Sequence, residues 1–246
     1  MIYKSEEGNA VFRRIYDEAL DKLGLNPEAR QVSTRFGDTH VLVFGPEGAP
    51  PLFMLHGGNT VSAETHEWYT PLAKQYRVYA PDLIGHPGNS AQVQLPTKDL
   101  SYGHWAADVV RALEIGPVPF MGTSYGGSIV LCTAAAEPKV LTKAILVMSG
   151  SIAMASNLSM AGKVIWPYLS YRLFRGRKRL KRFLRQIMDE PSETNIDVMA
   201  AVFKHLKMND LIPLLTDEQI ACCDVPTLVF AAENDIFFPG RKVLER

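Results

Sequence analysis

A serine flanked by small residues separates two segments of opposite character. Gly122-Thr123-Ser124-Tyr125-Gly126 follows the apolar run Val118 to Met121 and precedes a run that favours helix, Ser128 to Ala136. This arrangement predicts a sharp turn from a buried strand into a helix, in which only small side chains fit beside the serine. Such a turn lifts the serine hydroxyl above the sheet edge and directs backbone N–H groups toward it. The context favours a nucleophilic Ser124 over a chance Gly-x-Ser-x-Gly.

Short, continuous apolar runs recur along the chain and indicate buried parallel strands. They are Pro51–Leu55, Arg77–Ala80, Val118–Met121, Ala144–Met148 and Thr227–Ala231. Helix-length segments lie between the first four, including Tyr69–Gln75, Tyr102–Leu113 and Ser124–Glu137. Alternating strands and helices predict an α/β fold, with a mostly parallel sheet and helices on both of its faces.

The N-terminal part should precede this alternation with a helix and a hairpin. Apolar residues from Val11 to Leu23 share one helical face, and the helix should end near Gly24. Gln31–Phe36 and Thr39–Phe44 then read as two strands joined by a tight turn at Gly37-Asp38.

The interval between the strands ending at Met148 and beginning at Thr227 is far longer than an ordinary connection. Its composition is helix-rich, which predicts an inserted helical cap. We therefore expect the first part of the core at residues 1–150, the cap at 151–221 and the second part of the core at 222–246.

Composition excludes several classes of function. The 246-residue chain has a formal net charge of zero, so no overall field attracts nucleic acid or a membrane surface. Its first residues lack the apolar core of a signal peptide, and no apolar run reaches the roughly 20 residues that span a bilayer. The three cysteines, two of them adjacent, argue against a disulfide framework. We expect a cytoplasmic protein with no metal or organic cofactor, no nucleic-acid partner and no stable membrane association.

Glycines after the first parallel strand suggest a second part of the site. His56-Gly57-Gly58 follows Leu55, and glycine lets the backbone approach a ligand closely. The N–H groups of Gly58 and Tyr125 would together form an oxyanion hole, although a plain glycine-rich turn is the simpler alternative. We interpret His56 as structural, bracing this loop.

A carboxylate after the last strand is the candidate acid of the site. Asp235 follows Ala232-Glu233-Asn234 and precedes Pro239. A carboxylate there would fix the tautomer of a catalytic histidine. Glu233 is the local rival and a solvated turn acid is the structural alternative, but the position favours Asp235.

These segments together resemble the α/β-hydrolase superfamily, in particular its capped carboxylesterase-like members. The matching pieces, in family order, are His56-Gly57-Gly58, Asp82-Leu83-Ile84-Gly85-His86, the turn around Ser124, and Ala232–Asp235 through Pro239. The resemblance implies Ser124 as nucleophile, Asp235 as acid, the amides of Gly58 and Tyr125 as oxyanion hole, and no cofactor. It implies hydrolysis of a small or medium uncharged ester through an acyl-enzyme.

The family's catalytic histidine has no counterpart in the chain, because no histidine follows His205. The family places it after one more helix and one more strand, so we expect the chain to lack its C-terminal segment. The other histidines are not expected to replace it; they are His40, His66, His86, His104 and His205. We therefore expect the last strand to leave an unpaired sheet edge, through which a homodimer could form. The alternative function is that of a non-catalytic, hydrolase-like binding protein.

A basic run in the expected cap carries a separate signal. No acidic residue interrupts Arg172, Arg175, Arg177, Lys178, Arg179, Lys181, Arg182 and Arg185. Leu180, Phe183, Leu184, Ile187 and Met188 fit one helical face. The run could contact anionic lipid or gate an acidic substrate. The sequence favours the simpler interpretation, a cap helix that packs its apolar face over the pocket and exposes its basic face to solvent.

Overall fold

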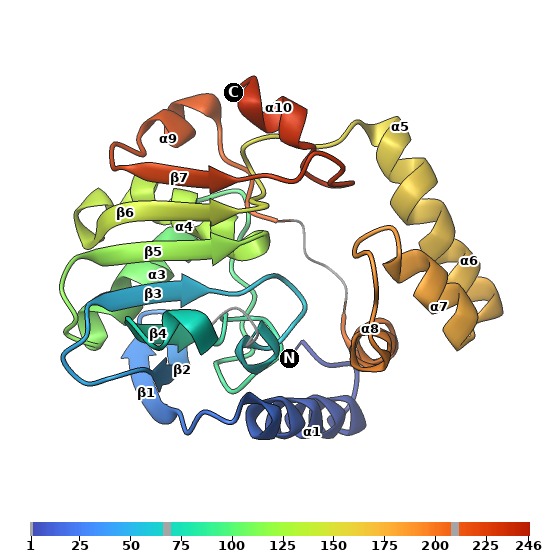
Figure 1. Ribbon diagram of the computed structural model, residues 1–246, viewed down its shortest axis with the longest axis horizontal. Coiled ribbons are helices and arrows are strands. Elements are labelled where there is room, and N and C mark those ends of the chain that lie inside the picture. The colour runs from blue at the N-terminus through green and yellow to red at the C-terminus, as the bar shows by residue number, and fades with distance from the viewer. Residues whose placement is uncertain (1, 66–69, 208–211) are drawn as a thin grey trace.

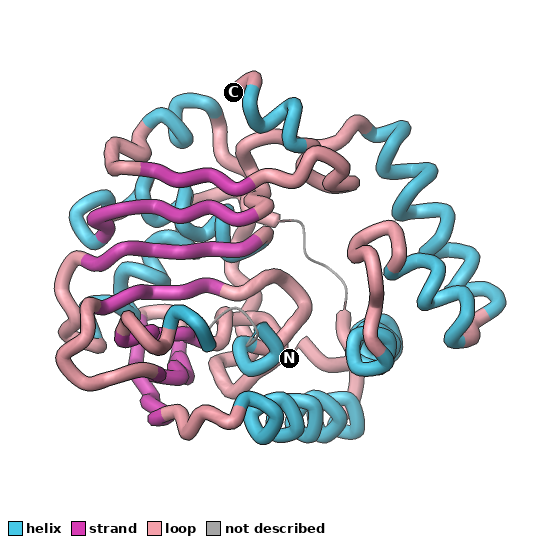
Figure 2. Tube along the Cα trace, viewed as in Figure 1, coloured by secondary structure: helices cyan, strands magenta, loops and turns pink. Residues whose placement is uncertain are grey.

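The computed structural model describes residues 2–65, 70–207 and 212–246. Within them one sheet has the strand order β1-β2-β4-β3-β5-β6-β7 (Figures 1 and 2). The strands are β1 (Glu28–Thr34), β2 (Gly37–Phe44), β3 (Pro51–Leu55), β4 (Arg77–Pro81), β5 (Val118–Thr123), β6 (Leu141–Val147) and β7 (Thr227–Phe230). Strand β2 is antiparallel to β1 and β4, and the remaining pairs are parallel. The predicted α/β fold with a mostly parallel sheet is confirmed.

The two faces of the sheet bury two separate hydrophobic cores. On β2, Val41 and Val43 belong to one core and Leu42 and Phe44 to the other, because successive side chains of a strand point to opposite faces. Helices α3 (Ser101–Ala112) and α4 (Tyr125–Ala136) cover the first face, and α1 (Glu6–Leu23) packs into the core of the second. Helices therefore cover both faces, as predicted.

Helix α1 begins and ends where its terminal residues dictate. The Ser5 side chain caps the first turn by accepting a hydrogen bond from the Gly8 N–H at 3.2 Å. Gly24 ends the helix with φ 59°, a left-handed conformation that glycine adopts without steric cost. The predicted end near Gly24 is confirmed.

The hairpin turn is displaced from its predicted position at Gly37-Asp38. Strand β2 already begins at Gly37, which pairs with Thr34, so Arg35 and Phe36 form the turn. The Thr34 hydroxyl donates to the Gly37 carbonyl at 2.7 Å and accepts from the Phe36 N–H at 3.2 Å. The side chain of Thr34 thus closes the turn, which needs no glycine at its centre.

The long interval between β6 and β7 is helical, as predicted. It contains α5 (Asn157–Met160), the π-helical segment η3 (Ala161–Ile165), α6 (Trp166–Phe174), α7 (Arg177–Leu184), α8 (Glu193–His205) and α9 (Asp217–Ala221). Figure 1 shows α5 to α8 beyond the carboxyl ends of the parallel strands. The short helices η1 (Ser62–Thr65), η2 (Pro138–Val140) and α10 (Gly240–Leu244) complete the fold. Of the helix expected at 69–75, residues 70–72 are helical and residue 69 lies outside the described residues.

The N-terminus ties this helical segment to the sheet. Tyr3 forms an antiparallel bridge with Leu206, and the Lys4 N–H donates to the His205 carbonyl at 2.8 Å. Behind this bridge, Phe12 of α1 shares a core with Phe203 of α8. The described helices include none long and apolar enough to cross a membrane.

Strand β7 differs from its prediction as a buried strand. All four of its residues are exposed, because only β6 pairs with it among the described strands. In Figure 1, β7 forms one edge of the sheet.

Candidate active site

Ser124 occupies a strained turn between β5 and α4. Its backbone has φ 52° and ψ −110°, outside the ordinary regions for a residue with a side chain. Such conformations cost about 1–3 kcal/mol and persist only where the surrounding structure enforces them. The predicted sharp strand-to-helix turn is therefore present at the predicted serine.

The glycines on either side of Ser124 have no room for a side chain. A Cβ atom at Gly122 would lie 2.4 Å from the carbonyl oxygen of Gly126. A Cβ atom at Gly126 would lie 2.4 Å from the carbonyl oxygen of Leu55, at the end of β3. Because both obstacles are backbone atoms, the close approach of β3, β5 and α4 requires glycine at both positions.

Two backbone hydrogen bonds fix the turn to the end of β6. The Ser124 N–H donates to the Val147 carbonyl at 3.0 Å, and the Ser124 carbonyl accepts from the Gly150 N–H at 3.2 Å. The serine is half-buried, and its hydroxyl makes no hydrogen bond with any described residue. The backbone of Ser124 is therefore held while its hydroxyl is available to a reactant.

The loop after β3 lies directly against this turn. A Cβ atom at Gly57 would be 4.0 Å from the Ser124 Cβ, and one at Gly58 would be 3.1 Å from Cδ2 of Tyr125. The structure therefore brings Gly58 beside Tyr125, the two residues predicted to supply oxyanion-hole amides.

His56 is fully buried and both of its ring nitrogens are engaged by the backbone. Its Nδ1–H donates to the Gly57 carbonyl at 2.7 Å, and Nε2 accepts from the Leu83 N–H at 3.0 Å. Burial lowers the pKa of the imidazole below its ordinary value. These contacts fit one neutral tautomer and agree with the interpretation of His56 as a brace for the loop.

His86 contacts the residue that follows the serine. Its ring packs edge-on against the Tyr125 ring at a centroid distance of 4.5 Å. Burial, assisted by neighbouring His56, lowers the pKa of His86 to about 3. His86 Nε2 has no hydrogen-bond partner among the described residues. The sequence placed His86 near the site but carried no signal for its packing on Tyr125.

Asp235 lies in a compact loop after β7. One carboxylate oxygen, Oδ1, accepts hydrogen bonds from the N–H groups of Phe237 at 2.7 Å and Phe238 at 2.9 Å. Phe238 is buried, and its ring tip lies 3.5 Å from the position of a Cβ at Gly150, the residue bonded to the Ser124 carbonyl. Glu233, the rival acid, is exposed. Asp235 is thus the more firmly positioned of the two carboxylates.

The second acid of the matching motifs, Asp82, is buried at the end of β4. Its carboxylate is bonded by the Ser62 hydroxyl, by the Asn89 N–H at 2.8 Å and by His40 Nδ1 at 3.2 Å. A Cβ at Gly88 would lie 2.6 Å from its Cγ. Asp82 therefore closes the loop after β4. Its partners come from separate segments of the chain, so the sequence could not reveal them.

None of the described histidines hydrogen-bonds to Ser124. His104 contacts Glu137 at 2.9 Å, and His205 packs against Gly8 beside α1. His40 and His56 have the partners given above, and His86 Nδ1 lies 3.3 Å from the Ile84 carbonyl oxygen. His66 lies outside the described residues. In the described part of the chain no group of three or more histidine, cysteine, aspartate or glutamate residues is arranged to hold a metal ion.

Comparison with known proteins assigns the family. A family model described as alpha/beta hydrolase fold matches residues 50–173, a span that contains the glycine loop and the Ser124 turn. The chain belongs to the α/β-hydrolase fold family. Within that family it is carboxylesterase-like, as its similarity to Bacillus carboxylesterases shows.

Three of these similar proteins come from Bacillus subtilis. The carboxylesterase YbfK of strain 168 is 25% identical over 260 residues, covering 100% of this chain and 84% of that protein. The uncharacterised carboxylesterase nap is 36% identical over 119 residues, covering 47% of this chain and 39% of that protein. The crystal structure of naproxen esterase superposes with a TM-score of 0.79 at 23% identity, covering 97% of this chain and 85% of that one.

Proposed function

We propose that this protein hydrolyses carboxylic esters through an acyl-enzyme on Ser124. The strained turn that presents the Ser124 hydroxyl is the observation that carries the proposal. The similarity to carboxylesterases over the whole chain supports the choice of an ester as substrate. The Ser124 oxygen would attack the ester carbonyl, expel the alcohol and leave an acyl-serine that water then hydrolyses.

The backbone amides of Gly58 and Tyr125 would stabilise the charge that forms on the carbonyl oxygen. Their residues lie against each other beside Ser124. A preorganised donor of this kind contributes roughly 3–4 kcal/mol to lowering the barrier. By packing edge-on against the Tyr125 ring, His86 would hold one of these two residues in place.

Asp235 would orient and stabilise a histidine that accepts the Ser124 proton. The two backbone donors on Oδ1 fix the carboxylate, and Oδ2 makes no hydrogen bond with a described residue. Serine is a weak nucleophile at neutral pH unless a base removes its proton, so turnover depends on an imidazole at this position. No described histidine occupies it.

The helical segment 151–221 would form a cap over the substrate. Helices α5 to α8 stand beyond the carboxyl ends of the strands, where ligands bind in open α/β sheets (Figure 1). We therefore retain residues 1–150 and 222–246 as the catalytic core. An uncharged ester of small or medium size would enter between core and cap.

A non-catalytic binding role is the second candidate, and one observation favours it. None of the described histidines hydrogen-bonds to Ser124, which leaves the serine without a base among the described residues. In that case the glycine loop and the turn would bind a carbonyl compound without cleaving it.

Active-site labelling with a fluorophosphonate tests the nucleophile. When a C-terminal segment supplies the catalytic histidine, we expect one labelled serine, no labelling in Ser124→Ala, and unchanged labelling in Ser156→Ala, which removes an exposed serine. Labelling that persists in Ser124→Ala would refute the assignment.

Added imidazole separates the two candidate functions. With a p-nitrophenyl ester, imidazole should raise the rate of acyl-serine formation at Ser124 above the background measured with Ser124→Ala, because it supplies the missing base. Reversible ester binding with no acyl-serine under either condition would favour the binding role.

A further inference from the structure

The outer side of α6 and the residue before it carry a largely exposed apolar ridge. The ridge consists of Ile165, Trp166, Leu169, Leu173 and Phe174. Trp166, Leu169 and Leu173 follow Ile165 by one, four and eight residues, a spacing that places all four on one side of the helix. Trp166 is 71% exposed and Leu173 is 76% exposed. Isolated apolar residues are common at protein surfaces, but a contiguous ridge marks a site of interaction.

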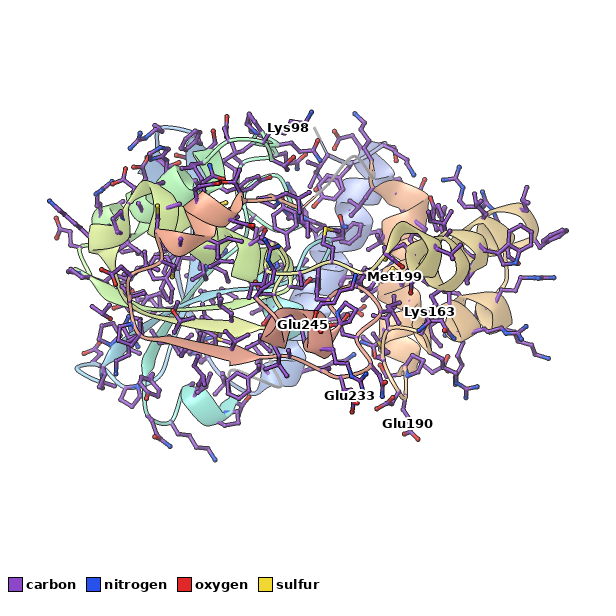
Figure 3. All side chains as sticks on the ribbon, turned by 90° about the horizontal axis from the view of Figure 1, so that it is seen from above. Lys98, Lys163, Glu190, Met199, Glu233 and Glu245 are labelled. Carbon is purple, nitrogen blue, oxygen red and sulfur yellow. The ribbon has the colours of Figure 1, made fainter. Side chains whose placement is uncertain are left out.

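Helix α7 places a dense cationic surface beside the ridge. Its own apolar residues, Leu180, Phe183 and Leu184, are buried in the core shared with α1 and α8, so its basic residues face outward. Of these, Arg177 pairs with Glu193 and Asp197, and Lys181 lies 3.9 Å from Glu193. The remaining basic residues of α7, Lys178, Arg179 and Arg182, have no carboxylate partner among the described residues. Neither do three basic residues of α6 and the segments that flank α7, namely Arg172, Arg175 and Arg185. In Figure 3, nitrogen-tipped side chains project outward from this end of the molecule.

The ridge and the cations meet in one groove between α6 and α7. Trp166 and Ser170 line it from α6, and Arg179 and Arg182 line it from α7, around a volume of about 380 Å³. The Arg179 guanidinium lies 4.8 Å over the Phe174 ring and 3.2 Å from the Ser170 hydroxyl. Exposed aromatic and aliphatic side chains bordered by arginines match the boundary between acyl chains and anionic headgroups.

We propose that this face of α6 and α7 docks reversibly on membranes that contain anionic phospholipid. The ridge enters the headgroup–acyl boundary, and Arg179, Arg182 and their neighbours bind lipid phosphate. Reversible docking is compatible with the expectation of no stable membrane association, and it adds a contact that the sequence could not show, because only the structure places the apolar side of α6 outward. The proposal does not depend on catalysis at Ser124.

Charge selects a lipid surface over a second copy of this chain. A two-fold contact through the ridge would place the arginines of both copies against each other, and like charges oppose such an interface. An anionic bilayer instead offers opposite charge and an apolar layer together. Because the whole chain has zero net charge, the attraction would come from this face and not from an overall field.

Vesicle co-sedimentation tests the proposal directly. We expect the protein to pellet with vesicles of phosphatidylcholine mixed with phosphatidylglycerol, and not with phosphatidylcholine alone. Added salt should weaken the binding, since screening reduces electrostatic attraction. Trp166 fluorescence should shift to shorter wavelength only with the anionic vesicles.

Two independent pairs of substitutions locate the contact. Arg179→Gln with Arg182→Gln should weaken binding by about 25-fold, since each basic residue near an anionic surface contributes about fivefold. Trp166→Ser with Leu173→Ser should abolish pelleting and leave the midpoint of urea unfolding nearly unchanged, because both side chains are exposed. Lys139→Gln with Lys143→Gln removes two exposed cations near the start of β6 and should leave binding unchanged.

Three results would overturn the proposal. They are absence of binding to anionic vesicles by the unaltered protein, binding that both α6 and α7 variants retain, and equal loss in the Lys139/Lys143 control. Binding to an acidic polypeptide such as polyglutamate without binding to vesicles would also overturn it, and would assign the face to an acidic protein partner.

Discussion

The carbonyl oxygen of Leu55 lies 2.4 Å from the position that a Cβ atom at Gly126 would occupy, and the carbonyl oxygen of His56 lies 2.6 Å from it. The chain segment that carries the glycine loop and the helix that carries the serine turn are therefore in direct backbone contact. Any side chain at position 126 must separate them.

Gly126→Ala should consequently destabilise the fold by about 1–3 kcal/mol, since overpacking against backbone atoms cannot be relieved by a rotamer change. Urea unfolding measures the loss. Gly162→Ala is the matched control: nothing lies within 4 Å of its added Cβ, and alanine in a helix should gain about 0.5–1 kcal/mol. Equal stability of Gly126→Ala and the unaltered protein would contradict the packing described here.

Asp235→Asn should change the rate of acylation without changing the stability of the fold. The asparagine oxygen can still accept from the Phe237 and Phe238 N–H groups, so the melting temperature should change little. Where a histidine accepts the Ser124 proton, loss of the negative charge should slow acylation of Ser124 by up to roughly 10⁴-fold. Glu233→Gln makes the same chemical change at the exposed neighbour and should leave the rate unaltered. If Glu233→Gln slowed acylation and Asp235→Asn did not, Glu233 and not Asp235 would be the acid of the site.

The buried histidines should make stability fall in mild acid. The pKa of His86 is about 3 in the folded protein, below its ordinary value of 6.5, so the unfolded chain binds more protons between these limits. The contribution of neutral, buried His86 to the free energy of unfolding is fully present above pH 6.5 and is lost progressively as pH falls toward 3. At pH 5 the loss is about 2 kcal/mol. Burial lowers the pKa of His56 as well, which acts in the same direction.

His86→Gln should therefore flatten the dependence of unfolding free energy on pH between about pH 7 and pH 5. His104→Gln removes a partly exposed histidine and should retain the fall. Chemical denaturation at a series of pH values provides the comparison. An unchanged slope in His86→Gln would show that other groups cause the acid sensitivity.

The exposed edge of the sheet should promote self-association. Leu228, Val229 and Phe230 are exposed on β7, whose outer side pairs with no described strand. A groove of about 740 Å³ runs between β7 and α10 and is lined by Val229, Val243 and Leu244 among others. Unpaired strand edges with apolar side chains pair with other chains. A homodimer through β7 is therefore expected at high protein concentration.

Val229→Lys should shift that equilibrium toward monomer, because a charge on an edge strand blocks edge-to-edge pairing. Light scattering at matched concentrations measures it. Val93→Lys makes the same substitution at an exposed valine outside the sheet and should have no effect. A protein that is monomeric without substitution would remove the basis for a dimer.

The sequence by itself determined the order of the elements and the position of the serine turn. Apolar runs such as Val118–Met121 are long enough to be strands, and a serine between Gly122 and Gly126 is compatible with few other structures. Helix α1 ends at Gly24 as expected, because the left-handed backbone conformation that ends a helix depends only on the local sequence. The predicted position of the hairpin turn was wrong because the hydrogen bond from the Thr34 hydroxyl to the Gly37 carbonyl closes the turn at Arg35 and Phe36.

Only the tertiary structure decided which residues meet. Contacts of His86 with Tyr125, and of Asp82 with Ser62 and His40, join segments far apart in the chain and leave no periodic trace in it. The same reason applies to β7, whose apolar composition resembles that of a buried strand although its burial depends on a neighbour. It applies also to α6: an apolar side predicts a contact, but the surrounding helices decide whether that side faces the core or the solvent.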